Sequence, residues 1–140
     1  MIRVVLDTNA VLMPIARTTS SDIWLREASE QQHIVPLISS DTKAELIRTL
    51  RNPRLGISEE QITDTAAAYF DHCERVAIPD SPPETPTCRD PKDQMFLVLA
   101  YQAAADYLVT KDPDLLALTE ESVIPIITPA SLRVILQRQP

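Results

Sequence analysis

Four acidic residues occupy matching places in the pattern of expected strands and helices: Asp7, Glu45, Asp93 and Asp112. The first and the last follow apolar runs that are typical of buried parallel strands. The other two are expected in the first turn of a helix. Right-handed crossovers bring such positions to one edge of a parallel sheet, so the sequence predicts an acidic cluster there.

Such a cluster has a definite chemistry. Like charges raise each other's pKa and destabilise a fold unless cations intervene. Oxygen ligands without histidine or thiolate favour Mg²⁺ or Mn²⁺ over zinc. Two divalent ions about 3.5–4 Å apart hydrolyse phosphodiesters by activating water and stabilising the leaving oxygen. We therefore expect one or two Mg²⁺ or Mn²⁺ ions as the cofactor.

Helix capping is the alternative explanation for most of these acids. Asp90 and Asp112 each precede a proline, as an N-cap residue often does. Glu45 follows Thr42 by three residues, which is the spacing of a capping box. Asp93 suits the dipole of a helix start. The residues after Asp7 do not resemble a helix start, and capping does not explain why the four positions coincide, so both interpretations stay open.

Strands and helices are expected to alternate along the chain. Apolar runs predict strands at residues 2–6, 34–38, 76–78, 107–110 and 122–127. Helical spacing predicts helices at about 22–32, 41–52, 58–75, 91–103, 113–118 and 129–136. A polar loop is expected at 14–21 and an extended loop at 79–87, while Pro36 suggests an edge strand. The predicted fold is α/β, a three-layer α/β/α sandwich with a mostly parallel central sheet.

Composition restricts the possible functions. The length of 140 residues predicts one domain, residues 1–140. We expect a cytoplasmic protein, because the chain has no apolar stretch long enough for a membrane helix, no signal peptide, and two isolated cysteines. The net charge of −7 argues against nucleic-acid binding but suits a site that gathers cations. A single glycine, Gly56, excludes a dinucleotide-binding turn, a P-loop and a nucleophile elbow.

Several motifs together resemble the PIN domain, most closely the PIN proteins that serve as toxins of bacterial and archaeal toxin–antitoxin systems. They are L-D-T-N at residues 6–9, Glu45, C-R-D-P-K-D at 88–93 before Phe96-Leu97, and A-D-Y-L-V-T-K-D at 105–112. The resemblance extends over essentially the whole chain. It implies a PIN-like fold and a Mg²⁺- or Mn²⁺-dependent ribonuclease, which is a hydrolase.

The resemblance also implies site residues. The metal-binding and catalytic acids would be Asp7, Glu45, Asp93 and Asp112. Supporting positions would be Asn9, Thr110, Asp90 and Asp114. Our hypothesis is that Asp7, Asp93 and Asp112 hold one ion, while Glu45 helps to hold a second or orients the attacking water. Lys111 departs from the family pattern, in which a small residue is common, and it is a candidate to contact phosphate or compete with a metal.

Basic residues near these motifs are candidate RNA contacts: Arg17, Arg48, Arg51, Arg89, Lys92 and Lys111. For Arg48 and Arg51 a solvated helix face is an equally good explanation. The resemblance to toxins further implies a small antitoxin protein as partner, and homodimers are common among such domains.

Two other functions compete with a nuclease. The first is a non-catalytic module whose acidic edge binds a protein partner or one structural cation. The second is a phosphoacceptor domain on a similar sheet. The second expects an aspartate at the end of a middle strand, whereas the strand at 34–38 ends at Ser39.

Overall fold

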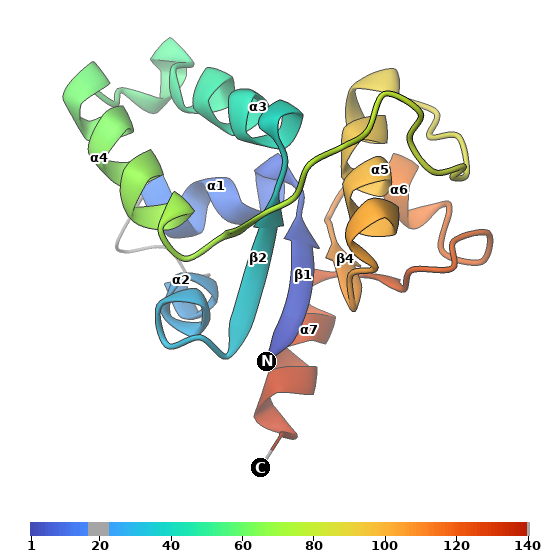
Figure 1. The fold of residues 1–140 in the computed structure, drawn as a ribbon. Coiled ribbons are helices and arrows are strands. Elements are labelled where there is room, and N and C mark those ends of the chain that lie inside the picture. The colour runs from blue at the N-terminus through green and yellow to red at the C-terminus, as the bar shows by residue number, and fades with distance from the viewer. Residues whose placement is uncertain (17–22, 140) are drawn as a thin grey trace.

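The computed structural model describes residues 1–16 and 23–139 (Figure 1). Its strands form one sheet in which every recorded pairing is parallel. In spatial order they are β3 (Glu74–Arg75), β2 (Ile34–Ile38), β1 (Ile2–Leu6), β4 (Tyr107–Val109) and β5 (Ile126–Ile127).

Helices follow most of the strands. In chain order they are α1 (Thr8–Ala16), α2 (Ile23–Glu30), α3 (Ser40–Leu50), α4 (Glu59–Phe70), α5 (Gln94–Ala103), α6 (Pro113–Leu116) and α7 (Pro129–Gln137). Two 3₁₀ turns, Pro53–Leu55 and Pro91–Asp93, precede α4 and α5. Among the described residues, no helix has the length and apolar character needed to cross a bilayer.

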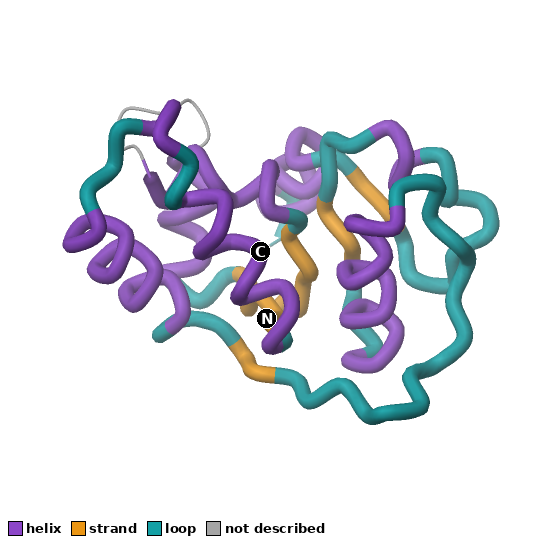
Figure 2. Tube along the Cα trace, turned by 90° about the horizontal axis from the view of Figure 1, so that it is seen from above, coloured by secondary structure: helices purple, strands orange, loops and turns teal. Residues whose placement is uncertain are grey.

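The sheet separates two apolar cores, because alternate side chains of each strand point to opposite faces. In β1, Val4 and Leu6 contribute to a core shared with α1, α2, α3, α4 and α7. Val5 contributes to the other core, which α5 and α6 cover. Figure 2 shows the strands between these groups of helices. The expected three-layer α/β/α sandwich is therefore confirmed, and its sheet is parallel throughout.

The order of the strands determines where a site is expected. The chain first adds β2 and β3 on one side of β1, and then returns to add β4 and β5 on the other. Ligands bind in open α/β sheets at the carboxyl ends of strands where this reversal occurs. Here those ends are adjacent, since Leu6 pairs with Val109 and the Asp7 amide donates to the Val109 carbonyl at 3.1 Å.

The segment after β1 was predicted wrongly. Instead of a polar loop from residue 14, the chain enters α1 immediately after Asp7, and Pro14 lies inside this helix. Proline removes one helical hydrogen bond, but Val11, Pro14 and Ile15 are all buried, and their burial compensates for that loss. Residues 17–21 of the expected loop lie outside the described residues.

Pro36 does not mark an edge strand, since β2 lies between β1 and β3. The Ile38 carbonyl accepts from Val76 N on the β3 side of β2, whereas the His33 carbonyl accepts from Ile2 N on the β1 side. The backbone N–H and C=O groups of even-numbered residues in β2 therefore point toward β3. The β3 strand pairs only with Leu37 and Ile38. The nitrogen of Pro36 therefore faces β3 at a position where no β3 residue is recorded as its partner. Proline is tolerated there although it cannot donate a ladder hydrogen bond.

Other expected boundaries shift by up to five residues. The helix expected at 58–75 ends at Phe70, and Glu74–Arg75 forms the strand expected at 76–78. The capping box expected between Ser58 and Gln61 is present. The one proposed between Thr42 and Glu45 is wrong, because Ser39 caps α3 and pairs with Thr42.

We predict that Ser39→Ala lowers the free energy of unfolding by about 1 kcal/mol, because it removes the side-chain cap of α3. Ser39 is buried and its hydroxyl accepts from the Thr42 amide at 3.3 Å. Urea denaturation measures the change. Ser40→Ala is the matched control, since Ser40 is exposed in the first turn of the same helix. Equal stability of the two variants would contradict the prediction.

Candidate active site

Asp7 is the most deeply buried of the predicted acids, with 3% of its surface exposed. Its Oδ1 accepts from the Ala10 amide at 2.8 Å, which caps α1, and its Oδ2 accepts from the Thr110 hydroxyl. Burial raises the pKa of Asp7, although these two hydrogen bonds and the positive charge of Lys111 act in the opposite direction. The two hydrogen bonds therefore hold the Asp7 side chain in a fixed orientation at the end of β1.

Thr110 connects Asp7 to the next acid. It is fully buried, and its hydroxyl accepts from the Asp112 amide at 2.9 Å while donating to Asp7. Asp112 then caps α6, because its Oδ1 accepts from the Asp114 amide at 2.8 Å. The capping interpretation of Asp112 is thus correct, and the same contacts orient it beside Asp7.

Asp90, Asp93 and Asp114 each offer a carboxylate oxygen, and these oxygens lie within 4.8 Å of one another. Asp90 also caps the turn Pro91–Asp93, since its Oδ1 accepts from the Lys92 amide at 3.0 Å. We call these three aspartates, with Asp7 and Asp112 beside them, the acidic cluster. It draws on the ends of β1 and β4 and on the starts of α5 and α6.

Asp93 is the acid that capping does not explain. It stands directly before α5 but makes no side-chain capping bond. Its Oδ2 is buried and has no hydrogen-bond partner among the described residues. Burial raises the pKa of Asp93 to about 7, and the neighbouring Asp112 carboxylate adds to the rise.

The acidic cluster fits a divalent cation. A buried oxygen without a donor normally costs free energy, and an ion would supply the missing partner. The available donors are carboxylate oxygens, which suit Mg²⁺ or Mn²⁺. Burial raises the pKa of the Cys88 thiol, and the negative charges of the nearby aspartates raise it further. Cys88 is therefore disfavoured as a thiolate ligand.

Glu45 is placed differently from the other predicted acids. It lies in the second turn of α3, and its carboxylate binds both the Nε and a terminal nitrogen of Arg48, at 3.0 and 2.5 Å. No contact between Glu45 and the acidic cluster is recorded in the described part of the chain. The structure therefore brings together Asp7, Asp93 and Asp112 with Asp90 and Asp114, and it pairs Glu45 with Arg48.

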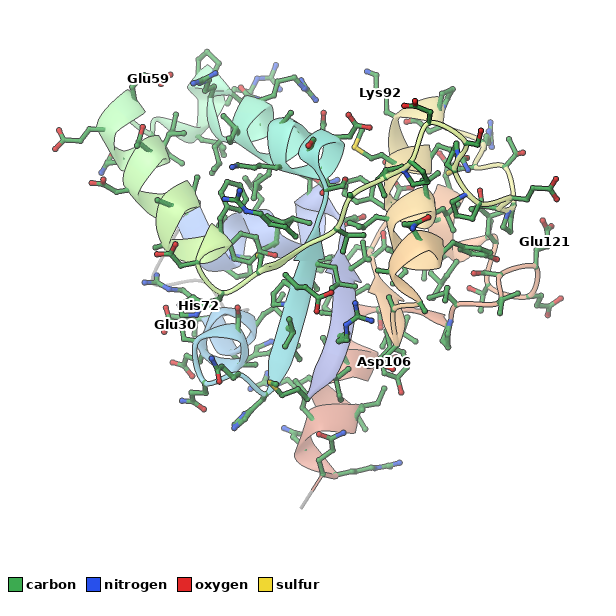
Figure 3. All side chains as sticks on the ribbon, viewed as in Figure 1. Glu30, Glu59, His72, Lys92, Asp106 and Glu121 are labelled. Atoms are coloured by element: carbon green, nitrogen blue, oxygen red, sulfur yellow. The ribbon has the colours of Figure 1, made fainter. Side chains whose placement is uncertain are left out.

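Among the described residues, the other predicted ones lie at the surface. Asn9 is exposed in the first turn of α1. Arg89, Lys92 and Lys111 are exposed in the segments that carry the acids, and Lys92 projects outward beside the start of α5 (Figure 3). Arg51 pairs with Glu59 at 3.2 Å. Arg17 lies outside the described residues.

One well-connected residue beside the cluster was not predicted. Gln94, the first residue of α5, makes three side-chain hydrogen bonds to residues 85–88. No motif or spacing in the sequence distinguishes it from any other polar residue at a helix start.

The chain is similar to a known domain family and to two solved structures. A family model described as "PIN domain" matches residues 3–114. The fold resembles a chain of VapBC2 from Rickettsia felis, solved bound to a DNA fragment from their promoter, with a TM-score of 0.57 at 13% identity over 90% of this chain and 97% of that chain. It also resembles PAE2754 from Pyrobaculum aerophilum, with a TM-score of 0.58 at 17% identity over 99% and 91% of the two chains.

No curated protein sequence matches the chain significantly. At such low identities the two solved structures show a shared fold. The family model is more informative, because it spans most of the chain, including β1, β4 and every residue of the acidic cluster. The chain belongs to the PIN-domain family.

Proposed function

We propose that residues 1–140 form one domain that acts as a divalent-metal-dependent endoribonuclease. PIN domains are generally nucleases, which makes a hydrolase the first expectation for this chain. The observation that carries the proposal is the buried oxygen without a partner on Asp93, a residue that belongs to a group of neighbouring carboxylates. A protein that used these aspartates only as helix caps would have no need to bury an uncompensated one.

The proposed cofactor is one or two Mg²⁺ or Mn²⁺ ions. Asp7, Asp93 and Asp112 would hold one ion, with Asp90 and Asp114 offering further oxygens. Glu45 would help to hold a second ion or orient water, after exchanging its contact with Arg48. When bound, such an ion stabilises developing negative charge and makes water a stronger nucleophile.

The protein's own residues would orient these groups. Thr110 holds Asp7 and the Asp112 backbone in one arrangement, so that both carboxylates keep their direction when the substrate arrives. Lys111 is exposed and close enough to act on the charge of Asp7, which suits contact with a substrate phosphate. Cys88 is 3% exposed and its pKa is raised by burial, so it is a poor nucleophile. Water is the proposed nucleophile instead.

The proposed substrate is RNA, with contacts from Arg89, Lys92 and Lys111 and weaker ones from Arg17, Arg48 and Arg51. We further propose that the protein is the toxin of a toxin–antitoxin pair in the cytoplasm. A small antitoxin protein would cover the acidic cluster with an arginine or lysine, and a homodimer is a possible assembly. The motif resemblance to toxins supports this, as does the fold shared with a chain of VapBC2.

We predict that end-labelled single-stranded RNA is cleaved only in the presence of Mg²⁺ or Mn²⁺. Asp7→Asn and Asp93→Asn should each lower the rate more than about a hundredfold, because even changes beside metal ligands cost tenfold to a hundredfold. Glu45→Gln should have a smaller effect. Glu121→Gln is the control, since this acid is exposed on a distant loop (Figure 3).

Three results would count against the nuclease. Equal cleavage by wild type and Asp93→Asn would indicate a contaminating enzyme. Cleavage that persists in EDTA would exclude a metal-dependent mechanism. Binding of Mn²⁺ without cleavage of any RNA would favour the non-catalytic module that binds a partner or a structural cation.

The raised pKa of Asp93 predicts how the metal-free protein responds to pH. Its value of about 7, against an ordinary 3.8, means that the folded state retains this proton to a higher pH than the unfolded state. The stability contributed by this proton is therefore lost as pH rises from about 4 to about 7. In EDTA, Asp93→Asn should raise the melting temperature, and the gain should be larger at about pH 8 than at about pH 5.

Differential scanning calorimetry of the two proteins at both pH values measures this difference. Mn²⁺ should stabilise wild type at the higher pH and have little effect on Asp93→Asn, because the ion binds the ionised carboxylate. A gain in melting temperature that does not depend on pH would show that Asp93 titrates normally.

A further inference from the structure

The segment that leads into the acidic cluster lacks secondary structure. Residues 77–89 follow β3, pass across the sheet and reach the start of α5 (Figure 1). Within the described part of the chain, no backbone-to-backbone hydrogen bond is recorded for these residues. The segment contains four prolines, and most of its side chains are exposed. Something other than a strand or helix ladder must therefore fix the position of its last residues, which directly precede Asp90.

Gln94 provides that attachment. Its Oε1 accepts from the Cys88 amide at 2.7 Å. Its Nε2 donates to the Thr85 hydroxyl at 2.7 Å and to the Pro86 carbonyl at 3.0 Å. The acceptor and both donors of the amide group are thus used on one short stretch of chain.

We propose that Gln94 is a positioning residue of the metal centre, which it shapes by closing the turn that carries Asp90 and Asp93. This inference rests on the proposed function. The turn begins at Cys88 and ends at Gln94, and the bond from the Cys88 amide to the Gln94 side chain joins its two ends. Cys88 is itself buried in the core that α5 covers, which fixes the first of these ends.

Electrostatics explains why the turn needs this closure. Asp90 and Asp93 lie on the same short turn with oxygens within 4.8 Å, and their like charges favour a wider turn. An ion would draw them together, but only after the protein has brought them within reach. A turn closed by Gln94 keeps the carboxylates gathered before the ion arrives, which lowers the entropic cost of binding it.

The test compares Gln94→Met with wild type in the affinity for Mn²⁺, measured by isothermal titration calorimetry on the full chain. Methionine keeps the length of the side chain and removes all three hydrogen bonds. We expect Mn²⁺ to bind about tenfold more weakly, as is typical when a group behind the ligands is lost. The rate of RNA cleavage should fall at limiting Mn²⁺ and recover at saturating Mn²⁺.

Gln102→Met is the matched control, because Gln102 is exposed near the other end of α5 and should leave Mn²⁺ affinity unchanged. Thr85→Val is a milder variant that serves if Gln94→Met does not fold. It removes only the hydrogen bond between Gln94 Nε2 and the Thr85 hydroxyl. It should therefore weaken Mn²⁺ binding, but by less than Gln94→Met does. The double variant should bind no more weakly than Gln94→Met alone.

A purely structural role gives a different result. If Gln94→Met and Thr85→Val lower the melting temperature but keep the wild-type affinity for Mn²⁺, the positioning role is wrong while the proposed nuclease stands. If wild type itself neither binds Mn²⁺ nor cleaves RNA, the proposed function fails, and the positioning role fails with it.

Discussion

The gathering of carboxylates at one end of a parallel sheet is the constraint on which this structure depends. Asp7 is buried at the end of β1, and the end of β4 brings Asp112 beside it. Each ionised acid makes the ionisation of the next less favourable, and burial adds to that cost. The fold offsets part of it with hydrogen bonds from Thr110 and from the Ala10 amide. The Asp93 oxygen without a partner is the part that is not offset.

Helix capping and metal binding are compatible uses of the same side chains. Asp90 and Asp112 each accept a backbone amide with one oxygen, which fixes the carboxylate and leaves its other oxygen available. A cap of this kind orients a ligand before any ion is present, which is the general advantage of preorganised sites. The capping and metal-site interpretations of the sequence therefore describe two consequences of one arrangement. Asp93 separates them, because it has no capping bond.

Membership of the PIN-domain family favours a nuclease, and the acidic cluster is its candidate active site. Many activities share α/β folds, so a nuclease is inferred from the acidic cluster and from membership of the PIN-domain family, and not from the fold alone. The net charge of −7 makes an RNA substrate less obvious, since the protein as a whole repels phosphates. Exposed basic side chains beside the cluster, among them Lys92 and Lys111, would attract the phosphates of RNA locally.

Local signals in the sequence determined most of the elements. Apolar runs gave β1 and β2, and Ser58 with Gln61 gave the start of α4, because such patterns act over a few residues. The sequence failed where distant contacts decide. Pro14 looks like a helix breaker, yet it lies inside α1 because burial outweighs one lost hydrogen bond.

The site divides in the same way. The sequence alone determined which acids end the strands and precede the helices, and strand order and the right-handed crossovers then brought Asp7, Asp93 and Asp112 together, as expected. Only the tertiary structure decided how closely the carboxylates of Asp90, Asp93 and Asp114 gather. It also decided that Glu45 pairs with Arg48 and that Gln94 ties the preceding segment to α5. These outcomes depend on side-chain directions and on contacts between packed segments, which no local pattern of residue types encodes.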